Sequence, residues 1–397
     1  MKQRISDIIL SEVKGGWGEC PKEGDLLTPV IKTNNMTYEG FIDYSDLTMR
    51  HFEKSKLKKS FLMNGDLLIE KSGGTKYHSV GYINYFDGED NKFVCNNFVL
   101  ALRPDSTVVR PKYLFYQLKY KYESGQFSDC YNKTTGIQNL QVRTYLSKEI
   151  RIPTFDEQDE VVKCLDDITQ MILKQRNLLD DLDALVKSRF MEMFGDVLRN
   201  TKGFQMCHFG EYVYQMNIGP FGSDLKNDCF VSKEQSACMV YEQKHAIDKT
   251  LNVPTRYIDN EKYAHLKRFE IGPGDIIVSC RGTIGECWLL PDEAPKGIIH
   301  PSLMLIKPND AVNHEFLVYL LERILSEQTQ QGSGVKMAIK AKDLSKIVCI
   351  KPEREEQDYF IDFVHLVDKS RFVVQKEIKD LQELLDSKMD EYFGGEE

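Results

Sequence analysis

The chain has 397 residues, of which 41% are hydrophobic and 28% charged, and its formal net charge is −9. At roughly 150 residues a domain, this length predicts two to three domains, and the composition excludes disordered, fibrous and collagen-like proteins. No apolar run approaches the ~18 residues that span a bilayer, and the apolar patch before Ser11 is too short for a signal-peptide core. We therefore expect a cytoplasmic protein with no membrane partner.

The negative charge is concentrated in two segments. Residues 151–200 and 351–397 together carry −11, whereas the rest of the chain holds 38 basic and 36 acidic residues. Binding to nucleic acid needs clustered Lys and Arg to neutralise phosphates. The remaining parts are slightly positive, which permits a DNA-binding surface there without demanding one.

Ten cysteines are spread along the chain, and no two have C-x2-C or C-x4-C spacing. Zinc sites that use cysteine are typically built on such spacings. Reduced, mostly buried cysteines are therefore favoured over a metal site. We expect no metal on this chain.

The first region, residues 1–152, is interpreted as a compact α+β domain rich in short strands. A Gly-Asp turn feeds an aliphatic strand, and a glycine-containing loop follows. A strand-like run then leads into an aromatic helix, and a Thr-Gly segment comes ahead of Pro153. In order, these features are residues 64–66, 67–69, 71–75, 101–104, 113–116 and 135–138.

Residues 153–197 are predicted to form one long central helix. No Gly or Pro occurs between Glu157-Gln158 and Phe194, so the helix can run for ~38 residues, or ~57 Å at its usual rise. The Glu-Gln pair falls in the first turn, where helix capping is favoured over a catalytic role. Apolar residues alternately four and three positions apart define one seam; they are Val161, Leu165, Ile168, Ile172, Leu179, Leu182, Val186 and Met193.

The rest of the chain repeats this plan. The second region, residues 198–351, carries the same features at 273–275, 276–278, 281–285, 305–308, 316–319 and 333–336. In the C-terminal segment, residues 352–397, each position of the linker and helix is its counterpart plus 199. The shifted seam is Phe360, Val364, Val367, Arg371, Ile378, Leu381, Leu385 and Tyr392.

A helix with one apolar seam must bury it, and the equivalent helix of the same chain is the nearest partner. We therefore predict an intramolecular antiparallel coiled coil. Four polar residues lie on the seam: Gln175, Arg189, Arg371 and Lys388. They either fix register and orientation or lie at frayed points without a specific role.

The order of these segments resembles that of a known family, the specificity (S) subunits of Type I restriction-modification enzymes. The resemblance covers nearly the whole chain and rests on the duplicated arrangement of globular region, Pro with Glu-Gln, and long helix ending in Phe-Gly. Residues 219–226, Gly-Pro-Phe-Gly-Ser-Asp-Leu-Lys, also match a stretch common in the family's recognition domains. The first region has no Gly-Pro-Phe-Gly counterpart. The implied fold is α+β, with two β-rich target-recognition domains separated by two long helices, in a pseudo-twofold internal repeat.

The resemblance implies a non-catalytic subunit that recognises a bipartite, asymmetric sequence in double-stranded DNA. Each domain would read one half, and the helix pair would act as a ruler, because one DNA turn is about 34–36 Å. Family members assemble with a pair of methylation subunits, which transfer methyl groups from S-adenosylmethionine to adenine, and with translocating nuclease subunits that use ATP and Mg²⁺. No cofactor is expected on this chain.

Candidate DNA-binding residues lie in or near the glycine-flanked loops, because Arg or Lys reads guanine and Asn or Gln reads adenine. Arg281 directly follows a predicted strand, where its planar guanidinium could be held toward a base edge. Any one such residue is more often ordinary solvated surface, and phosphate contacts outnumber base contacts. Gly-Pro-Phe-Gly is equally expected as a turn that packs Phe221 into the core. The candidates are Lys71, Ser72, Thr75, Lys76, Gln138, Asn139 and Arg143 in the first domain and Ser223, Lys226, Arg281, Thr283, Lys336 and Lys340 in the second.

Other functions are less well supported by the sequence. A methyltransferase would need a glycine-rich cofactor loop after a strand, and we predict no apolar strand before Gly15-Gly16-Trp17-Gly18. It would also need an Asn- or Asp-Pro-Pro-aromatic motif, and no such motif or ATP-binding phosphate loop occurs. A coiled-coil scaffold that joins two protein-binding domains, or a specificity module of a methylation-only system, stays open.

Overall fold

A computed structural model describes residues 2–75, 78–134, 137–331 and 340–395. The chain forms two compact units, and both long helices contribute to each. Unit 1 comprises Met1–Asn177 with Gln375–Glu397, and unit 2 comprises Leu178–Val374. Within the described ranges, no helix combines the length and apolar character needed to cross a membrane. The predicted α+β class is confirmed.

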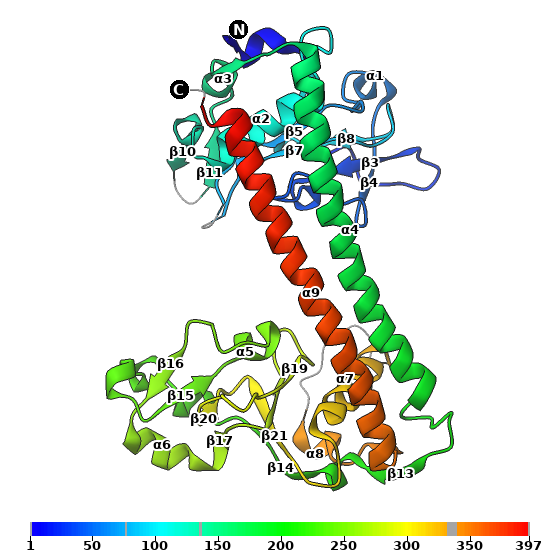
Figure 1. Cartoon of the computed structure of the whole chain (residues 1–397), viewed down its shortest axis with the longest axis vertical. Helices are drawn as coiled ribbons and strands as arrows, with labels where there is room; N and C mark the ends of the chain where they lie inside the picture. The colour runs from blue at the N-terminus through cyan, green and yellow to red at the C-terminus, as the bar shows by residue number, and fades with distance from the viewer. Residues whose placement is uncertain (1, 76–77, 135–136, 332–339, 396–397) are drawn as a thin grey trace. The chain divides into compact units, whose positions relative to one another are not determined.

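Unit 1 is built from short strands and from helices of very different length (Figure 1). Its strands are β1 (Lys2–Arg4), β2 (Ile9–Val13), β3 (Leu27–Ile31), β4 (Thr48–His51), β5 (Leu67–Glu70), β6 (Ser72–Gly73), β7 (Ile83–Tyr85), β8 (Val94–Cys95), β9 (Val99–Pro104), β10 (Tyr131–Thr134), β11 (Ile137–Leu140) and β12 (Glu149–Arg151). Its helices are α1 (Lys54–Leu57), α2 (Pro111–Glu123), α3 (Val142–Leu146) and the first part of α4 (Phe155–Phe194), joined by the last part of α9 (Arg354–Phe393).

Unit 2 contains a second set of short elements between the two long helices. Its strands are β13 (Gln205–His208), β14 (Val213–Ile218), β15 (Cys238–Tyr241), β16 (Arg256–Ile258), β17 (Glu270–Ile271), β18 (Ile276–Ser279), β19 (Cys287–Leu289), β20 (Gly297–Ile299), β21 (Leu303–Pro308) and β22 (Val348–Lys351). Its short helices are α5 (Gln243–Asp248), α6 (Asn260–Leu266), α7 (His314–Gln331) and α8 (Ala341–Leu344).

The central sheet of each unit is buried on both faces. Successive side chains of a strand point to opposite faces, so Leu67 and Ile69 of β5 join the core beneath α2 and the long helices, while Leu68 joins a second core beside β3 and β8. In unit 2, Ile276 and Ile277 of β18 likewise point to opposite faces of the sheet and join two different cores. Apolar runs without alternation, such as these, are therefore explained by a layer on each side.

The strand order confirms the internal repeat. The four-stranded sheet has the order β2-β9-β5-β7 in unit 1 and β14-β21-β18-β19 in unit 2. In each unit a second sheet pairs one strand with both an antiparallel and a parallel neighbour, β3 with β4 and β8, and β15 with β16 and β20. Ile9 pairs with Pro104 and Val213 with Pro308, each followed by an irregularity in register. These N-terminal strands thus correspond at an offset of 204, not the 199 that relates the helices.

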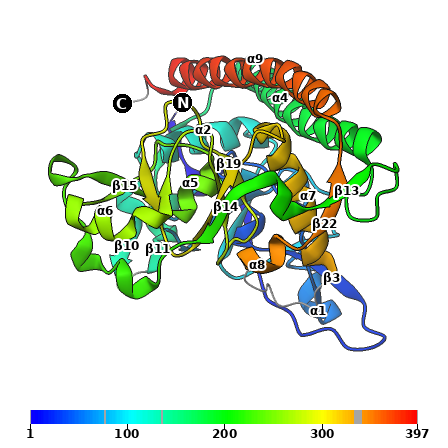
Figure 2. The ribbon, with the colours of Figure 1, turned by 90° about the horizontal axis from the view of Figure 1, so that it is seen from below.

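In unit 1 the two long helices pack antiparallel, side by side in both Figure 1 and Figure 2. Gln175 donates a hydrogen bond to Glu377 at 2.7 Å, and the side chains of Tyr392 and Cys164 are hydrogen-bonded. Residue numbers therefore rise along one helix as they fall along the other. Four seam residues of α4 are buried in one core with Leu385 of α9, and Ile378 and Leu381 are partly buried against it. The four are Val161, Leu165, Ile168 and Ile172.

In unit 2 the helices also pack antiparallel, around a cluster of phenylalanine rings. The rings of Phe190 and Phe194 lie 5.4 and 5.7 Å from that of Phe360, measured between centroids. Arg371 pairs with Asp183 at 2.5 Å. Val186, Val364 and Val367 are buried there, whereas Leu182 is partly buried against the same core and Leu179 is of intermediate exposure.

Three of the four polar seam residues bond across the helix pair. Besides Gln175 and Arg371, Arg189 lies 3.3 Å from the Tyr359 hydroxyl. Lys388 instead pairs with Glu391 of its own helix at 2.6 Å. The cross-helix bonds favour the interpretation that polar seam residues fix register, at three positions of the four.

Each Glu-Gln pair ties a long helix to its domain. Glu157 accepts hydrogen bonds from the backbone N–H and the hydroxyl of Thr154, both at 2.9 Å, which is the capping arrangement predicted. The buried Gln158 accepts from the backbone of Arg110, at the start of α2, at 2.7 Å. Gln357 accepts in the same way from the backbone of Asn313, just ahead of α7, at 2.8 Å. The glutamine thus holds two helix starts together.

Candidate nucleic-acid interface

Three loop segments meet at one edge of the central sheet in unit 2. β21 is antiparallel to both β14 and β18, so its first residue lies beside the last residues of both neighbours. Hydrogen bonds from the backbone N–H groups of Gly219 and Cys280 to the carbonyls of Leu303 and Ser302, at 2.9 and 2.8 Å, fix this meeting point. We call residues 219–223, 280–285 and 300–302 the loop edge of unit 2.

Unit 1 has the equivalent loop edge, formed by residues 14–18, 71–75 and 96–98. The backbone N–H of Gly16 donates to the carbonyl of Cys95 at 2.8 Å, and that of Lys71 donates to the carbonyl of Phe98 at 2.7 Å. Applying the offset of 204 to residues 96–98 gives 300–302. The two edges are therefore the same structural feature built twice.

Glycine is required at one matching position of both edges. A Cβ atom on Gly15 would overlap the carbonyl oxygen of Asn96, and one on Gly219 would overlap that of His300. These pairs are related by 204 residues, as are Trp17 and Phe221. Gly15-Gly16-Trp17-Gly18 is thus the counterpart of Gly-Pro-Phe-Gly that the sequence analysis did not find in the first region.

Two further expectations about these segments are wrong. Strand β2 ends at Val13, two residues before Gly15, where no apolar strand was predicted. Phe221 is 76% exposed and does not pack into the core, because the following residues turn away and place Leu225 in the core instead.

The structure brings most first-domain candidates together. β11 pairs with β6, which places Gln138 and Asn139 opposite Gly73 and Ser72. The Ser72 hydroxyl donates to the Asn139 side chain at 2.7 Å, while the Gln138 side chain accepts from the backbone of Val80 at 3.2 Å. Gln138 therefore supports the loop as well as lying beside it.

The other first-domain candidates differ in position and exposure. Thr75 is exposed at the loop edge and Lys71 is half-buried there. Arg143 is exposed on α3, which follows β11 directly. Lys76 lies outside the described residues.

In the second domain, Ser223, Arg281 and Thr283 are exposed on the loop edge. Lys226 is exposed three residues beyond it, and Lys340 is exposed directly before α8. Lys336 lies outside the described residues. The second-domain candidates Ser223, Arg281 and Thr283 thus share the loop edge, whereas Lys340 belongs to a separate segment.

Sequence reasoning missed Gln243, the first residue of α5. Its side-chain amide donates to the carbonyl oxygens of Arg281 and Thr283, at 2.6 and 3.0 Å. Gly282 between them has φ of +66°, and a Cβ there would lie 3.3 Å from the Gln243 amide nitrogen. Gln243 therefore fixes the backbone of the Arg281 loop through these hydrogen bonds. No sequence spacing relates Gln243 to that loop.

The electrostatics beneath the edges favour neutral groups. Burial lowers the pKa of His300, an effect opposed by Glu242 and reinforced by Arg256 and Arg281. The His300 ring bonds to the Ser302 hydroxyl at 2.8 Å. In unit 1, burial raises the pKa of Glu70, which accepts from the backbone of Gly74 at 3.3 Å.

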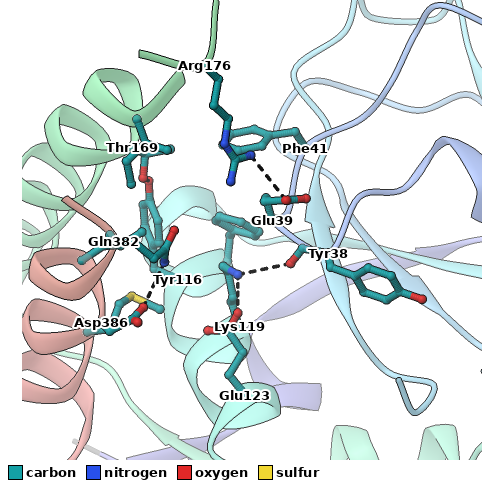
Figure 3. Close-up of a pocket in the computed structure, with 14 residues that line it drawn as sticks. Tyr38, Glu39, Phe41, Tyr116, Lys119, Glu123, Thr169, Arg176, Gln382 and Asp386 are labelled. Atoms are coloured by element: carbon teal, nitrogen blue, oxygen red, sulfur yellow. Dashed lines mark hydrogen bonds and ion pairs between the residues drawn. The ribbon is translucent and has the colours of Figure 1, made fainter. Parts of the chain in front are cut away.

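A pocket of about 220 Å³ in unit 1 is lined by none of the candidate DNA-binding residues (Figure 3). It lies among α2, α4, α9 and the segment at residues 38–41. Figure 3 shows Arg176 of α4 and Glu39 pointing toward one another, and their charged groups are 3.3 Å apart. Lys119, which also lines the pocket, pairs with Glu123 of the same helix. Asp386, which also lines the pocket, accepts a hydrogen bond from the Gln382 side chain at 3.1 Å.

In the part of the chain that the structure describes, no group of three or more His, Cys, Asp or Glu side chains is placed to hold a metal ion. Cys207 of β13 and Cys349 of β22 lie opposite each other in the strand register, and both are free thiols.

The chain resembles known proteins over most of its length. Residues 20–181 and 238–383 match the family described as Type I restriction modification DNA specificity domain. Over 390 residues the sequence is 20% identical to the putative type I restriction enzyme MjaX specificity subunit of Methanocaldococcus jannaschii, covering 95% of this chain and 90% of that one.

Among solved structures that align with this chain at low identity, one with a TM-score above 0.5 shares its fold. One comes from work on complex assembly and conformational transition of the type I R-M system; it has 16% identity and a TM-score of 0.58, over 100% of this chain and 98% of the other. Another is a Type-I restriction-modification system S subunit from M. genitalium, with 16% identity and a TM-score of 0.48, over 98% of this chain and 94% of the other.

Proposed function

This chain belongs to the Type I restriction modification DNA specificity domain family, and from that premise we propose that it recognises a bipartite, asymmetric sequence in double-stranded DNA, one half with each loop edge. The observation that supports this proposal is the duplicated loop edge. Its framework is alike in both units, but the residues at matching positions differ, for example the exposed Arg281 in one and the half-buried Ser72 in the other. Two similar backbone frameworks that present different side chains are suited to recognising two different half-site sequences.

The chain supplies recognition, and its partners supply catalysis in this proposal. A pair of methylation subunits would carry S-adenosylmethionine, and translocating nuclease subunits would use ATP and Mg²⁺. Because the substrate is cellular and incoming DNA, the complex would act in the cytoplasm. No catalytic step is assigned to residues of this chain.

The test is to compare the methylated sequences of a host strain with and without this gene, together with DNA binding by the chain assembled with its methylation partner. We expect one bipartite motif to lose methylation when the gene is removed. We also expect binding to that motif to weaken steeply as salt rises, because Lys and Arg displace counterions from phosphates. Unchanged methylation and no salt-dependent DNA binding would favour a protein-binding scaffold instead.

The helix pair is proposed to set the gap between the half-sites. Inserting the same few residues into both α4 and α9 should change the unspecified gap in the methylated motif and leave both half-site sequences unchanged. A motif with an unaltered gap would refute the role as a ruler.

A further inference from the structure

Trp17 and Phe221 occupy the same position of the duplicated framework. Each lies two residues after a glycine that only fits because it lacks a side chain, and each is followed by a glycine. Strand pairing begins at Ile9–Pro104 in unit 1 and at Val213–Pro308 in unit 2. From there to the loop the offset between corresponding residues stays at 204, because neither strand has an extra residue relative to the other. Both units thus present one aromatic side chain at the same point of the loop edge.

Both rings are exposed. Phe221 is 76% exposed and Trp17 is 39% exposed, although the Trp17 ring makes an edge contact with Phe98 at 6.1 Å between centroids. Folding alone does not account for a large apolar group held outward at an anchored position, because burial of such a group is favourable. The exposed faces are therefore available to a binding partner.

The neighbours of these rings are polar and mostly basic or hydroxylic. Lys14, Lys71 and Ser72 share the loop edge of unit 1 with Trp17, and Ser223 and Arg281 share that of unit 2 with Phe221. Among the described residues of the unit 2 loop edge, Phe221 is the one large hydrophobic residue with more than a third of its surface exposed. In unit 1 the 43% exposed Phe98 lies against the Trp17 ring, so the exposed apolar surface there comprises two rings. One or two rings among cationic and hydroxyl groups suit a polyanion that also offers flat apolar faces, and they lack the wide apolar surroundings of a protein-binding hot spot.

The two residue types limit the kind of contact. Phenylalanine has no hydrogen-bonding group, so it cannot read a base edge by donors and acceptors. Indole and phenyl rings share only a flat aromatic face. Base–aromatic stacking uses that face and tolerates a change of ring type.

We propose that Trp17 and Phe221 are equivalent DNA-contacting residues, each packing its ring against a base of a partly unstacked step in its own half-site. This inference rests on the proposed function. The two rings would then contribute to DNA affinity without neutralising phosphates. They also add one residue in each domain to the polar candidates that were selected from the sequence. Apolar side chains that part a base step are a known way for proteins to hold DNA.

The experiment measures binding of the assembled methylation complex to a duplex that carries the motif methylated by the wild-type complex, over a series of salt concentrations. We expect Phe221→Ala and Trp17→Ala each to weaken binding by about 5- to 150-fold without changing the slope of log affinity against log salt. Phe221→Trp and Trp17→Phe should restore most of the affinity. Tyr214→Ala is the matched control, because Tyr214 is 71% exposed near the far end of β14, and it should bind like the wild type.

A second measurement reports the stacking directly. With 2-aminopurine placed in turn at each adenine position of a half-site, fluorescence should rise on binding at one position, and Phe221→Ala should abolish that rise in one half-site only. Wild-type affinity in both alanine variants, or no responding position, would overturn the inference while leaving the proposed function intact. Loss of complex assembly in the variants, measured by mass, would assign the rings to a protein contact instead. If the wild-type complex itself fails to bind any methylated motif, the proposed function fails first.

Discussion

The support of the Arg281 loop by Gln243 can be tested through a substitution distant from any proposed base contact. Gln243→Ala removes two hydrogen bonds to loop carbonyls, at 2.6 and 3.0 Å. Each is worth about 0.5–1.5 kcal/mol net, so the loop should lose about 1–3 kcal/mol of stabilisation. If binding must restore the loop at that cost, DNA affinity falls by about 5- to 150-fold.

The assay is binding of the assembled complex to its methylated motif and to motifs mutated in one half-site at a time. We expect Gln243→Ala to reduce discrimination in the second half-site and to leave discrimination in the first unchanged. Gln215→Ala is the matched control, because Gln215 also donates from its side-chain amide to a backbone carbonyl of unit 2, that of Arg268 at 3.1 Å. Wild-type affinity and discrimination in Gln243→Ala would refute the argument.

Three other substitutions test the proposed base contact of Arg281, the packing of the long helices, and the buried carboxyl group of Glu70 beside the loop edge of unit 1. Arg281→Ala should relax preference at one position of the second half-site if it reads a base, which a methylation profile identical to the wild type would contradict. Leu165→Ala should lower the free energy of unfolding by about 2–5 kcal/mol, because Leu165 is fully buried, whereas Leu384→Ala, at a 45% exposed position, should have little effect; denaturant titration compares them. Burial raises the pKa of Glu70, so stability from this group is present at low pH and is lost as pH rises through that raised value. Glu70→Gln should therefore raise the Tm at neutral pH, by an amount that shrinks on acidification, and a pH-independent difference would contradict the assignment.

The long helices were predictable because their evidence is local. An uninterrupted seam with spacing of four and three residues survives any change in the residues around it. The helices begin at Phe155 and Arg354 and end at Phe194 and Phe393, within a few residues of the predicted limits. The Glu-Gln pairs were predicted to be caps, but their role in holding α2 and α7 depends on contacts 48 and 44 residues away in sequence.

The first loop edge was missed because the repeat changes its offset. The helices correspond at 199 residues and the N-terminal strands at 204, so a search at one spacing does not align Gly15 with Gly219. What the two segments share is a backbone too close to a neighbouring carbonyl for any Cβ, and a sequence does not display that proximity. Gln243 was missed for the same reason, since its partners come from another strand connection.

Unit 2 is one uninterrupted stretch of chain, whereas unit 1 is assembled from both chain ends. Two genetic crossovers, one inside each long helix, would therefore exchange a whole recognition module together with the core that supports it. If the crossovers keep the heptad spacing, the seam stays in phase and the incoming module needs no repacking. If each unit recognises one half-site, as proposed above, such an architecture would let a lineage acquire a new half-target by recombination, without accumulating compensating point substitutions.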